Sequence, residues 1–366
     1  MIEGGKISYK QMILLVFVSR IIGWIAFLPV ILASPANQDV WIDCLMAAPI
    51  HLIVALPVYL LFKKFPNQTL YEYSQAITGK IGQWVVGILY IWFFIHMAAL
   101  NLSNFSEFFT TIIMPETPSL FFVITLTLVS AYAAHKGIEV LGRLSEFIAP
   151  IIMIALIGVV LLLVKDMDLK ELTPILEKGI YPSILTGLSP VAQTVEIIGL
   201  AIIFPFINDR QKIKKVYIFT PLLLGLFLFI LTISVIALLG DDLAKSLTYP
   251  FYSIVRLVHV GNFLERIEAI HVAVWILGMF IKTAFYYYLI VLGLAQLFHL
   301  KDYKPLILPT GTIIVSLSNV LGQSIVELRE FISFNIYTWY TLFFILFIPS
   351  LLLLTATIRK KGERSR

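Results

Sequence analysis

Ser19-Arg20-Ile21-Ile22-Gly23-Trp24 lies halfway along an apolar run that extends from Ile7 to Ala33. A membrane-spanning helix needs about 20 apolar residues, so an arginine at the middle of this run lies where a charge is least tolerated. Glycine lets a backbone leave helical geometry, and non-helical backbone at membrane depth occurs only where it lines a cavity or is buried in protein. We therefore predict that the first helix is broken at Gly23 and that the break forms one wall of a ligand site.

The composition of the 366-residue chain is that of a polytopic membrane protein. Hydrophobic residues make up 59% of it and charged residues only 13%, whereas a soluble globular chain carries roughly a quarter charged residues. The mean hydropathy is +0.93. Cys44 is the only cysteine and the histidines are dispersed, so we expect no disulfide, no metal and no cofactor. Nothing resembles a P-loop, a dinucleotide fingerprint, a zinc-protease motif or a nucleophile elbow, so we expect no enzyme.

Ten apolar segments separated by charged residues, proline or glycine are predicted to cross the membrane as helices. They are 7–33, 40–62, 81–114, 119–134, 141–164, 183–207, 216–239, 267–299, 305–321 and 334–358. The predicted fold class is an all-α polytopic membrane protein, with residues 1–366 in a single transmembrane domain. In the connection before the eighth segment, the amphipathic run from Ile254 to Phe263 is predicted to form a short helix that is either a lid or a cap on the bundle.

The basic residues indicate the orientation of the chain. If both termini are cytoplasmic, most of the 27 lysine and arginine residues fall on the cytoplasmic side, including those of a basic tail at 359–366. Cytoplasmic segments of membrane proteins carry such an excess, so we predict cytoplasmic termini and an even number of spans. The net charge of +5 is thus a signal of topology, and we expect no nucleic-acid partner.

Ten spans divide into two halves of five with opposite orientation, as in transporters built from inverted repeats. We assign residues 1–165 and 180–358 to the two repeats, so the sixth span is the counterpart of the first and should also be broken at the midplane. Its sequence from Gly187 to Leu200, GLSPVAQTVEIIGL, holds glycine, proline, polar residues and one carboxylate at the expected place. Paired interruptions in corresponding spans point to a binding site.

Three charged residues lie near midplane depth, namely Arg20, Glu196 and Lys282. Each costs about 2.5–3.5 kcal/mol on insertion scales, so they should pair or face a wet cavity. Two cations and one carboxylate leave one positive charge, which an amino-acid carboxylate would neutralise with help from free amides near Gly23 and Trp24. Two alternatives stay open: Lys282 is deprotonated and its proton is the coupled ion, or Arg20 and Glu196 form a structural bridge and Lys282 is solvated.

Other polar side chains are candidates for the same cavity. Asn101 and Asn104 share one face of the third span, where they either line the site or form interhelical hydrogen bonds. Tyr286 lies one turn from Lys282 on the same face. The predicted ligand-binding residues are Arg20, Ile22, Gly23, Trp24, Asn101, Asn104, Glu196, Gly199, Lys282 and Tyr286.

Four short motifs carry a resemblance to a known family. They are Ile7-Ser8-Tyr9-Lys10-Gln11, the stretch Gly23 to Pro29 that ends Phe27-Leu28-Pro29, Phe65-Pro66-Asn67-Gln68-Thr69-Leu70, and Phe204-Pro205-Phe206. Taken together, and over nearly the full length, the chain resembles the spore germination permease family. These proteins are the B subunits of endospore nutrient germinant receptors, in the amino acid-polyamine-organocation superfamily. Arg20 departs from the largely uncharged first span of that family.

The resemblance implies a LeuT-like fold of five plus five inverted spans with broken helices 1 and 6. It implies residence in the inner membrane of the spore and partnership with a receptor A subunit and a lipoprotein C subunit. It also implies that the protein senses a nutrient, often an amino acid, and that the assembled receptor triggers germination and ion release. An autonomous proton-coupled amino-acid transporter, with Lys282 or Glu196 as the proton carrier, is the alternative, because one fold supports both functions.

Overall fold

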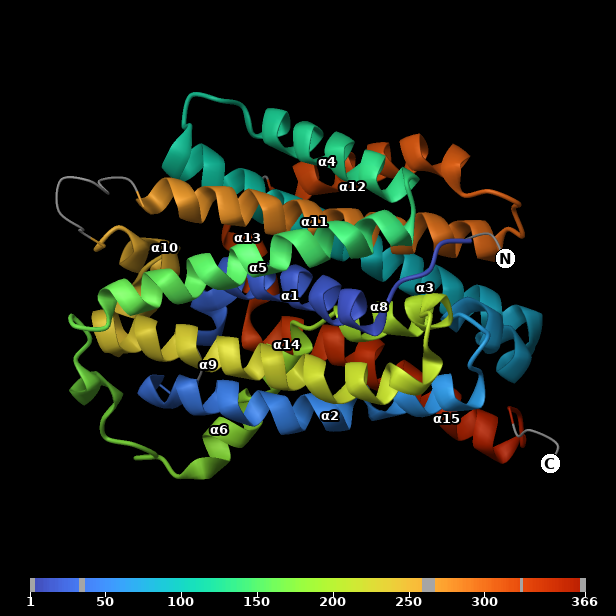
Figure 1. Ribbon diagram of the computed structural model, residues 1–366, viewed down its shortest axis with the longest axis horizontal. Helices are drawn as coiled ribbons and strands as arrows, with labels where there is room; N and C mark the ends of the chain where they lie inside the picture. Colours follow the sequence, from blue (N-terminus) through green and yellow to red (C-terminus); the bar gives the residue numbers. More distant parts are fainter. Residues whose placement is uncertain (1–3, 33–36, 259–266, 323–324, 363–366) are drawn as a thin grey trace.

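The long helices of the protein lie roughly parallel in one bundle, and the two ends of the chain lie at the same end of it (Figure 1). The computed structural model describes residues 4–32, 37–258, 267–322 and 325–362. Within these ranges the structure is helical apart from its connections and one isolated bridge between Ile7 and Ile207. The prediction of an all-α chain is confirmed.

The helices follow the predicted apolar segments closely. The first half contains α1 (Tyr9–Leu32), α2 (Val40–Lys64), α3 (Leu70–Phe108), α4 (Ser119–His135) and α5 (Ile138–Leu163). The second half contains α6 (Ile180–Thr186), α7 (Leu188–Ala192), α8 (Glu196–Ile203), α9 (Ile213–Ser246), α10 (Pro250–Val255), α11 (Ile267–Leu297), α12 (Ile307–Leu321), α13 (Ile325–Ile332), α14 (Phe334–Leu342) and α15 (Ile348–Ile358). Only the first two residues of the short helix predicted at 254–263 are helical in the described part of the chain, because α10 ends at Val255. Residues 259–263 lie outside the described residues.

The helices confirm a multi-pass membrane protein. Among the described residues, eight helices are long and apolar enough to cross a membrane, and the bent pair Ile180–Ala192 and Glu196–Phe206 is a ninth candidate. The helix Ser119–His135 is apolar but shorter. The count of ten spans and the inverted repeat therefore stay predictions.

The first helix is not broken, so that part of the prediction is wrong. α1 runs without interruption from Tyr9 to Leu32, through Gly23. The reason for glycine at this position is space rather than backbone freedom, because a Cβ atom on Gly23 would lie 2.7 Å from the Nζ atom of Lys282 on α11. Gly23 lets the lysine side chain cross the surface of α1.

The sixth span is broken where the sequence predicts. Its two parts, Ile180–Ala192 and Glu196–Phe206, are bent by 47°. At the bend the Thr194 amide donates to Val191 O at 2.8 Å rather than to Pro190 O, as it would in a regular α-helix. The amide of Ile197 likewise donates to Thr194 O at 3.1 Å. These tighter turns free the carbonyl of Pro190 to accept hydrogen bonds from side chains.

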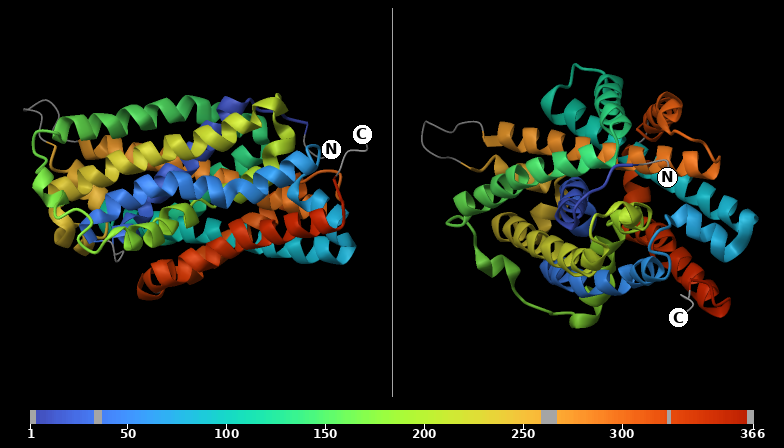
Figure 2. Two further views of the ribbon diagram at one scale, coloured as in Figure 1. Left: turned by 90° about the horizontal axis from the view of Figure 1, so that it is seen from below. Right: turned by 45° about the vertical axis from the view of Figure 1, so that its right-hand side comes forward.

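α1 lies inside the bundle and is covered by other helices (Figure 2). It packs against α5, α9 and α11. The segment before α1 is fastened to the end of the sixth span, since the Ile7 amide donates to Phe206 O and the Asn208 amide donates to Ile7 O, both at 2.9 Å. The entry to the first span and the exit of the sixth are thus held together at the end of the bundle where the termini lie.

Close packing between α1 and α11 depends on Gly278. A Cβ atom on Gly278 would lie 1.9 Å from Cγ1 of Ile22, so a larger residue forces the helices apart. Overpacking of this kind costs typically about 1–3 kcal/mol. We expect Gly278→Ala to lower the unfolding temperature of the detergent-purified protein, measured by size-exclusion chromatography after heating, and Gly278→Ala/Ile22→Ala to recover part of the loss.

Gly158→Ala is the matched control, because nothing lies within 4 Å of the position that its Cβ would take. We expect its unfolding temperature to equal or exceed that of the wild type, as alanine favours helix. If Gly278→Ala and Gly158→Ala lowered the unfolding temperature equally, the close approach of α1 and α11 would not be the reason for glycine at position 278.

Candidate functional site

Glu196 is the centre of a buried polar cluster at the break of the sixth span. It lies in the first turn of α8, where a negative charge is favoured by the helix dipole, and its side chain is 0% exposed. Its Oε1 atom accepts hydrogen bonds from Ser19 Oγ at 2.7 Å, from Tyr286 OH at 2.9 Å and from Lys282 Nζ at 3.0 Å. The carboxylate therefore joins α1, α8 and α11.

Lys282 provides the counter-ion of this carboxylate. Its side chain is 3% exposed, and Nζ also donates to the carbonyl of Ser19 at 3.1 Å. The ammonium lies 5.1 Å from the ring centroid of Tyr286, within the range of a cation–π contact. These contacts, with α1, with Glu196 and with Tyr286 on α11, hold the lysine side chain in one place.

Arg20 is also fully buried, but it does not pair with Glu196. Its Nε donates to Thr194 Oγ1 at 3.0 Å, and its Nη2 donates to the freed carbonyl of Pro190 at 2.8 Å. Within the described part of the chain, the only ion pair of this cluster joins Lys282 to Glu196. The alternative of an Arg20–Glu196 bridge with a solvated lysine is therefore wrong. The irregular turn provides a carbonyl and a hydroxyl that accept from the Arg20 guanidinium, and the Glu196 carboxylate pairs with Lys282 instead.

Several buried polar atoms around this cluster have no hydrogen-bond partner among the described residues. Two belong to the cluster itself, Arg20 Nη1 and Glu196 Oε2. The others are Trp24 Nε1 and both side-chain amide atoms of Gln193, which lie close to Arg20 and Thr194 in the sequence. A buried polar group without a partner costs roughly 1–3 kcal/mol, and more when it is charged. A ligand with both an acceptor and a donor would satisfy the guanidinium and the carboxylate.

The structure brings together five of the ten predicted site residues, namely Arg20, Gly23, Glu196, Lys282 and Tyr286.

The other five lie elsewhere or contact the cluster only indirectly. Ile22 packs against Gly278, and Gly199 faces the side chains of Phe285 and Leu289. The Asn101 side chain donates to Met97 O of its own helix at 2.5 Å. Trp24 and Asn104 are buried, and Trp24 Nε1 and Asn104 Oδ1 have no partner among the described residues. The ligand-binding role of all ten stays a prediction.

Sequence reasoning missed three contributors to this cluster. Ser19 and Thr194 hold Glu196 and Arg20 directly, although both were part of the stretches that drew attention to the site. Tyr337 of α14 is buried close to the same two charges. Arg20 and Glu196 each demand hydrogen-bonding neighbours once they are buried, so a hydroxyl beside each in sequence was a usable signal, whereas nothing local pointed to Tyr337.

A family model described as "Spore germination protein" matches residues 6–324 of the chain. This chain belongs to the spore germination permease family. Spore germination protein KB of Bacillus subtilis (strain 168) is 30% identical over 374 residues, which cover 100% of this chain and 98% of that protein. Spore germination protein YndE of the same organism is 25% identical, with 98% of this chain and 99% of that protein covered.

Solved structures of transporters show the fold of this family member. A Na⁺-coupled sialic acid symporter in a substrate-bound outward-open state matches with a TM-score of 0.67 and 11% identity, over 93% of this chain and 79% of that chain. MhsT in complex with L-phenylalanine matches with a TM-score of 0.56 and 12% identity, over 97% of this chain and 99% of that chain. These neighbours have the LeuT fold, and the likeness in structure shows that this chain has it too.

Removal of one partner from the buried pair should destabilise this permease strongly. Lys282→Met leaves the Glu196 carboxylate without a counter-ion in an apolar interior, and loss of one partner of such a pair costs about 3–5 kcal/mol. We expect the double variant Lys282→Met/Glu196→Gln to be more stable than Lys282→Met, because its buried amide carries no charge. Thermal unfolding of the purified protein measures both.

Lys245→Met serves as the control for the loss of a lysine. The side chains of Lys245 and Asp241, which form an ion pair, are 25% and 21% exposed. We therefore expect the free energy of unfolding to fall by less than about 1 kcal/mol. A double variant no more stable than Lys282→Met would contradict the view that the uncompensated charge is what destabilises the fold.

Proposed function

We propose that this chain is a nutrient-sensing membrane subunit of a spore germination receptor and that it binds a small zwitterion, most simply an amino acid, at the break of the sixth span beside α1. The observation that carries the proposal is a pair of buried, oppositely charged side chains, each with one polar atom that has no hydrogen-bond partner among the described residues. Among the residues that the structure describes, Arg20 has no carboxylate partner, and neither its Nη1 atom nor the Oε2 atom of Glu196 has a hydrogen-bond partner.

The ligand's two charged ends match these two positions. A carboxylate accepts from the Arg20 guanidinium, and an ammonium donates to Glu196 Oε2, so both orphaned atoms gain charge-assisted hydrogen bonds. The ligand carboxylate also supplies the negative charge that the cluster of Arg20, Lys282 and Glu196 lacks. A ligand with only one of these charges leaves the other buried atom unsatisfied, so the site favours zwitterions.

The comparisons support this ligand class and this role. The relatives carry the name of spore germination proteins, and MhsT, which shares the fold, was solved with L-phenylalanine. In LeuT-fold proteins the interrupted spans form the binding site, and the bend of 47° lies beside Arg20 here. Arg20 contacts Pro190, before the break, and Thr194, within it. A ligand on Arg20 therefore favours one geometry of the bend and shifts the protein toward that conformation.

The remaining parts of the proposal concern the surroundings of the protein. A receptor A subunit and a lipoprotein C subunit are its partners, and the inner membrane of the spore is its location, with both termini in the cytoplasm. Ligand binding changes the conformation of this subunit, and the assembled receptor then triggers germination and ion release.

An autonomous proton-coupled amino-acid transporter is the second candidate. The buried Lys282–Glu196 pair favours it, because the ammonium donates a hydrogen bond to the carboxylate. Ionisable groups paired in this way inside a membrane protein can take up or release a proton as the site opens. The transporter fold of the neighbours is compatible with both functions.

Arg20 offers a direct test of the proposed ligand. We expect at least one amino acid in a panel to raise the unfolding temperature of the purified wild type, since a ligand at 100 times its Kd adds about 2.7 kcal/mol of stability. The stabilisation should disappear in Arg20→Met and persist in Arg143→Met, whose side chain is exposed and pairs with Glu139. The methyl ester and the N-acetyl derivative of the same amino acid should each stabilise less than the parent.

Equal stabilisation of wild type and Arg20→Met would place the ligand elsewhere. If no amino acid stabilises the wild type, the isolated subunit does not bind this ligand class. Uptake of the stabilising amino acid into proteoliposomes, driven by a pH gradient, would favour the transporter over the receptor.

A further inference from the structure

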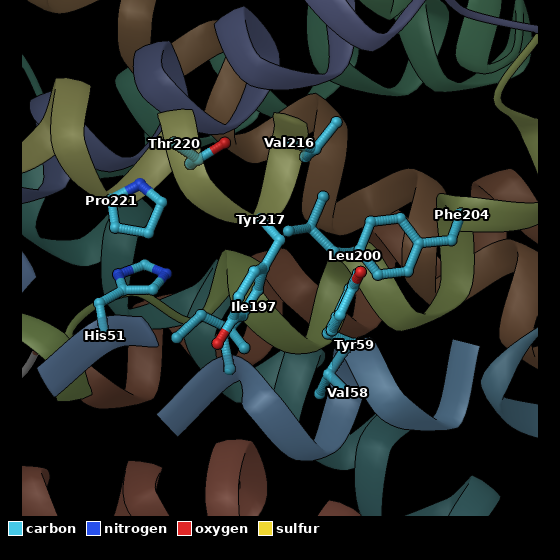
Figure 3. A pocket seen from close by; sticks show the side chains of 11 residues that line it. His51, Val58, Tyr59, Ile197, Leu200, Phe204, Val216, Tyr217, Thr220 and Pro221 are labelled. Carbon is cyan, nitrogen blue, oxygen red and sulfur yellow. The ribbon is translucent and has the colours of Figure 1, made fainter. Parts of the chain in front are cut away.

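Two tyrosines stack across the interface between α2 and α9, close to the end of the bundle where the termini lie. Tyr59 of α2 and Tyr217 of α9 have ring centroids 4.6 Å apart and an interplanar angle of 15°. They line one edge of a narrow crevice between α2, α8 and α9 (Figure 3). The crevice has room for about one water molecule. Both tyrosines are half-buried, so a larger ligand meets them from outside, along the surface of the two helices.

A lysine lies one turn beyond this stacked pair on each helix. α2 and α9 run in opposite directions, since Cys44 contacts Thr232 while Tyr59 contacts Tyr217. Lys63 follows Tyr59 by four residues and Lys214 precedes Tyr217 by three, so both lie about 4.5 to 6 Å further toward the same end of the bundle. The ammonium of Lys63 is 5.3 Å from the centroid of the Tyr59 ring. The two lysines therefore flank the α2–α9 interface at a similar depth.

The positive charge of this place is not neutralised by the protein. Both lysines are exposed, and within the described ranges of the chain no ion pair joins either of them to a carboxylate. Arg210, just before α9, adds a third cation and donates a hydrogen bond to Asn67 Oδ1 in the turn after α2. The adjacent carboxylate, Asp209, pairs with Lys212 at 3.0 Å. The interface thus carries a net positive charge that attracts an anion.

The helix surface on the other side of the tyrosines is apolar. Leu56 lies seven residues before Lys63, on the same face of α2, and is 40% exposed. Leu222 lies about two turns from Lys214 on α9 and is 49% exposed. Along the helix axes a ligand therefore meets cations, then aromatic rings, then apolar side chains. A phospholipid offers the complementary groups in the same order, namely a phosphate, a glycerol region and acyl chains.

We propose that the α2–α9 interface binds an anionic phospholipid, with its phosphodiester between Lys63 and Lys214, its glycerol region against Tyr59 and Tyr217, and its acyl chains along the two helices. The charge decides the class of lipid. A headgroup with its own cation, such as phosphocholine, brings no net negative charge, so a phosphatidylglycerol is favoured.

This site is distinct from a general excess of positive charge. Topology alone accounts for many basic residues at this end of the bundle, but it does not require two of them to flank a stacked aromatic pair. The site is also separate from the charged cluster around Glu196, and it does not depend on the function proposed above.

Native mass spectrometry of the detergent-purified full chain tests the site, with dioleoylphosphatidylglycerol and dioleoylphosphatidylcholine as the probes. We expect the wild type to retain phosphatidylglycerol in preference to an equal concentration of phosphatidylcholine. Each basic residue near an anionic lipid contributes about 5-fold in affinity, so the Kd for phosphatidylglycerol should rise at least about 10-fold in Lys63→Met/Lys214→Met. Lys63→Arg/Lys214→Arg keeps both charges and should bind within about 2-fold of the wild type, because arginine also binds phosphate.

Lys301→Met/Lys304→Met is the matched control. It removes two exposed lysines from the connection between α11 and α12, which lies at the same end of the bundle but away from α2 and α9 (Figure 1). Because distant exposed charges are largely screened by salt, its Kd for phosphatidylglycerol should stay within about 2-fold of the wild type. Free sn-glycerol 3-phosphate, which has no acyl chains, should not displace phosphatidylglycerol from the wild type.

Four results would overturn the proposal. An unchanged Kd in Lys63→Met/Lys214→Met would remove the role of the two lysines. An equal loss of affinity in Lys301→Met/Lys304→Met would reduce the effect to general attraction between a basic protein and an anionic lipid. Equal retention of phosphatidylcholine would remove the preference for an anionic headgroup. Displacement by sn-glycerol 3-phosphate would show a site for a soluble phosphate instead of a lipid.

Discussion

The rest of this structure depends on one constraint, which is that charged side chains buried in the protein must be paired or hydrogen-bonded there. Glu196, Lys282 and Arg20 are all within 3% of full burial, and each must find its partners inside the protein. The carboxylate does so by collecting three donors from two other helices on one oxygen. α1, α8 and α11 therefore cannot separate or slide without exposing a charge to an apolar interior.

The break in the sixth span supplies the hydrogen-bond acceptors that the buried Arg20 needs. A regular helix uses its own carbonyls, so it has nothing to offer a guanidinium. The tighter turns after Pro190 release a carbonyl, and Arg20 takes it together with the Thr194 hydroxyl. The irregular backbone and the buried arginine thus satisfy each other, and neither would be tolerated at this depth alone.

The sixth span is held on both sides of its bend. At one end its exit is joined to the segment before α1 through Ile7, and near the bend Arg20 and Ser19 of α1 hold its two halves. A change in the bend is therefore transmitted to α1 and to the end of the bundle where the termini lie. The proposed sensing role requires a connection of this kind between the charged cluster and the ends of the helices.

The sequence alone determined the all-α class, the positions of the helices and the break in the sixth span, because apolar length, proline and glycine act locally on the backbone. It also indicated that Arg20, Glu196 and Lys282 belong together, because a lone charge in an apolar run is too costly. It could not assign the partners, since Gly23 is as compatible with a broken helix as with a close contact. Only the packing of α11 against α1, which places Lys282 over Gly23, decided that α1 stays continuous and that the lysine rather than the arginine neutralises Glu196.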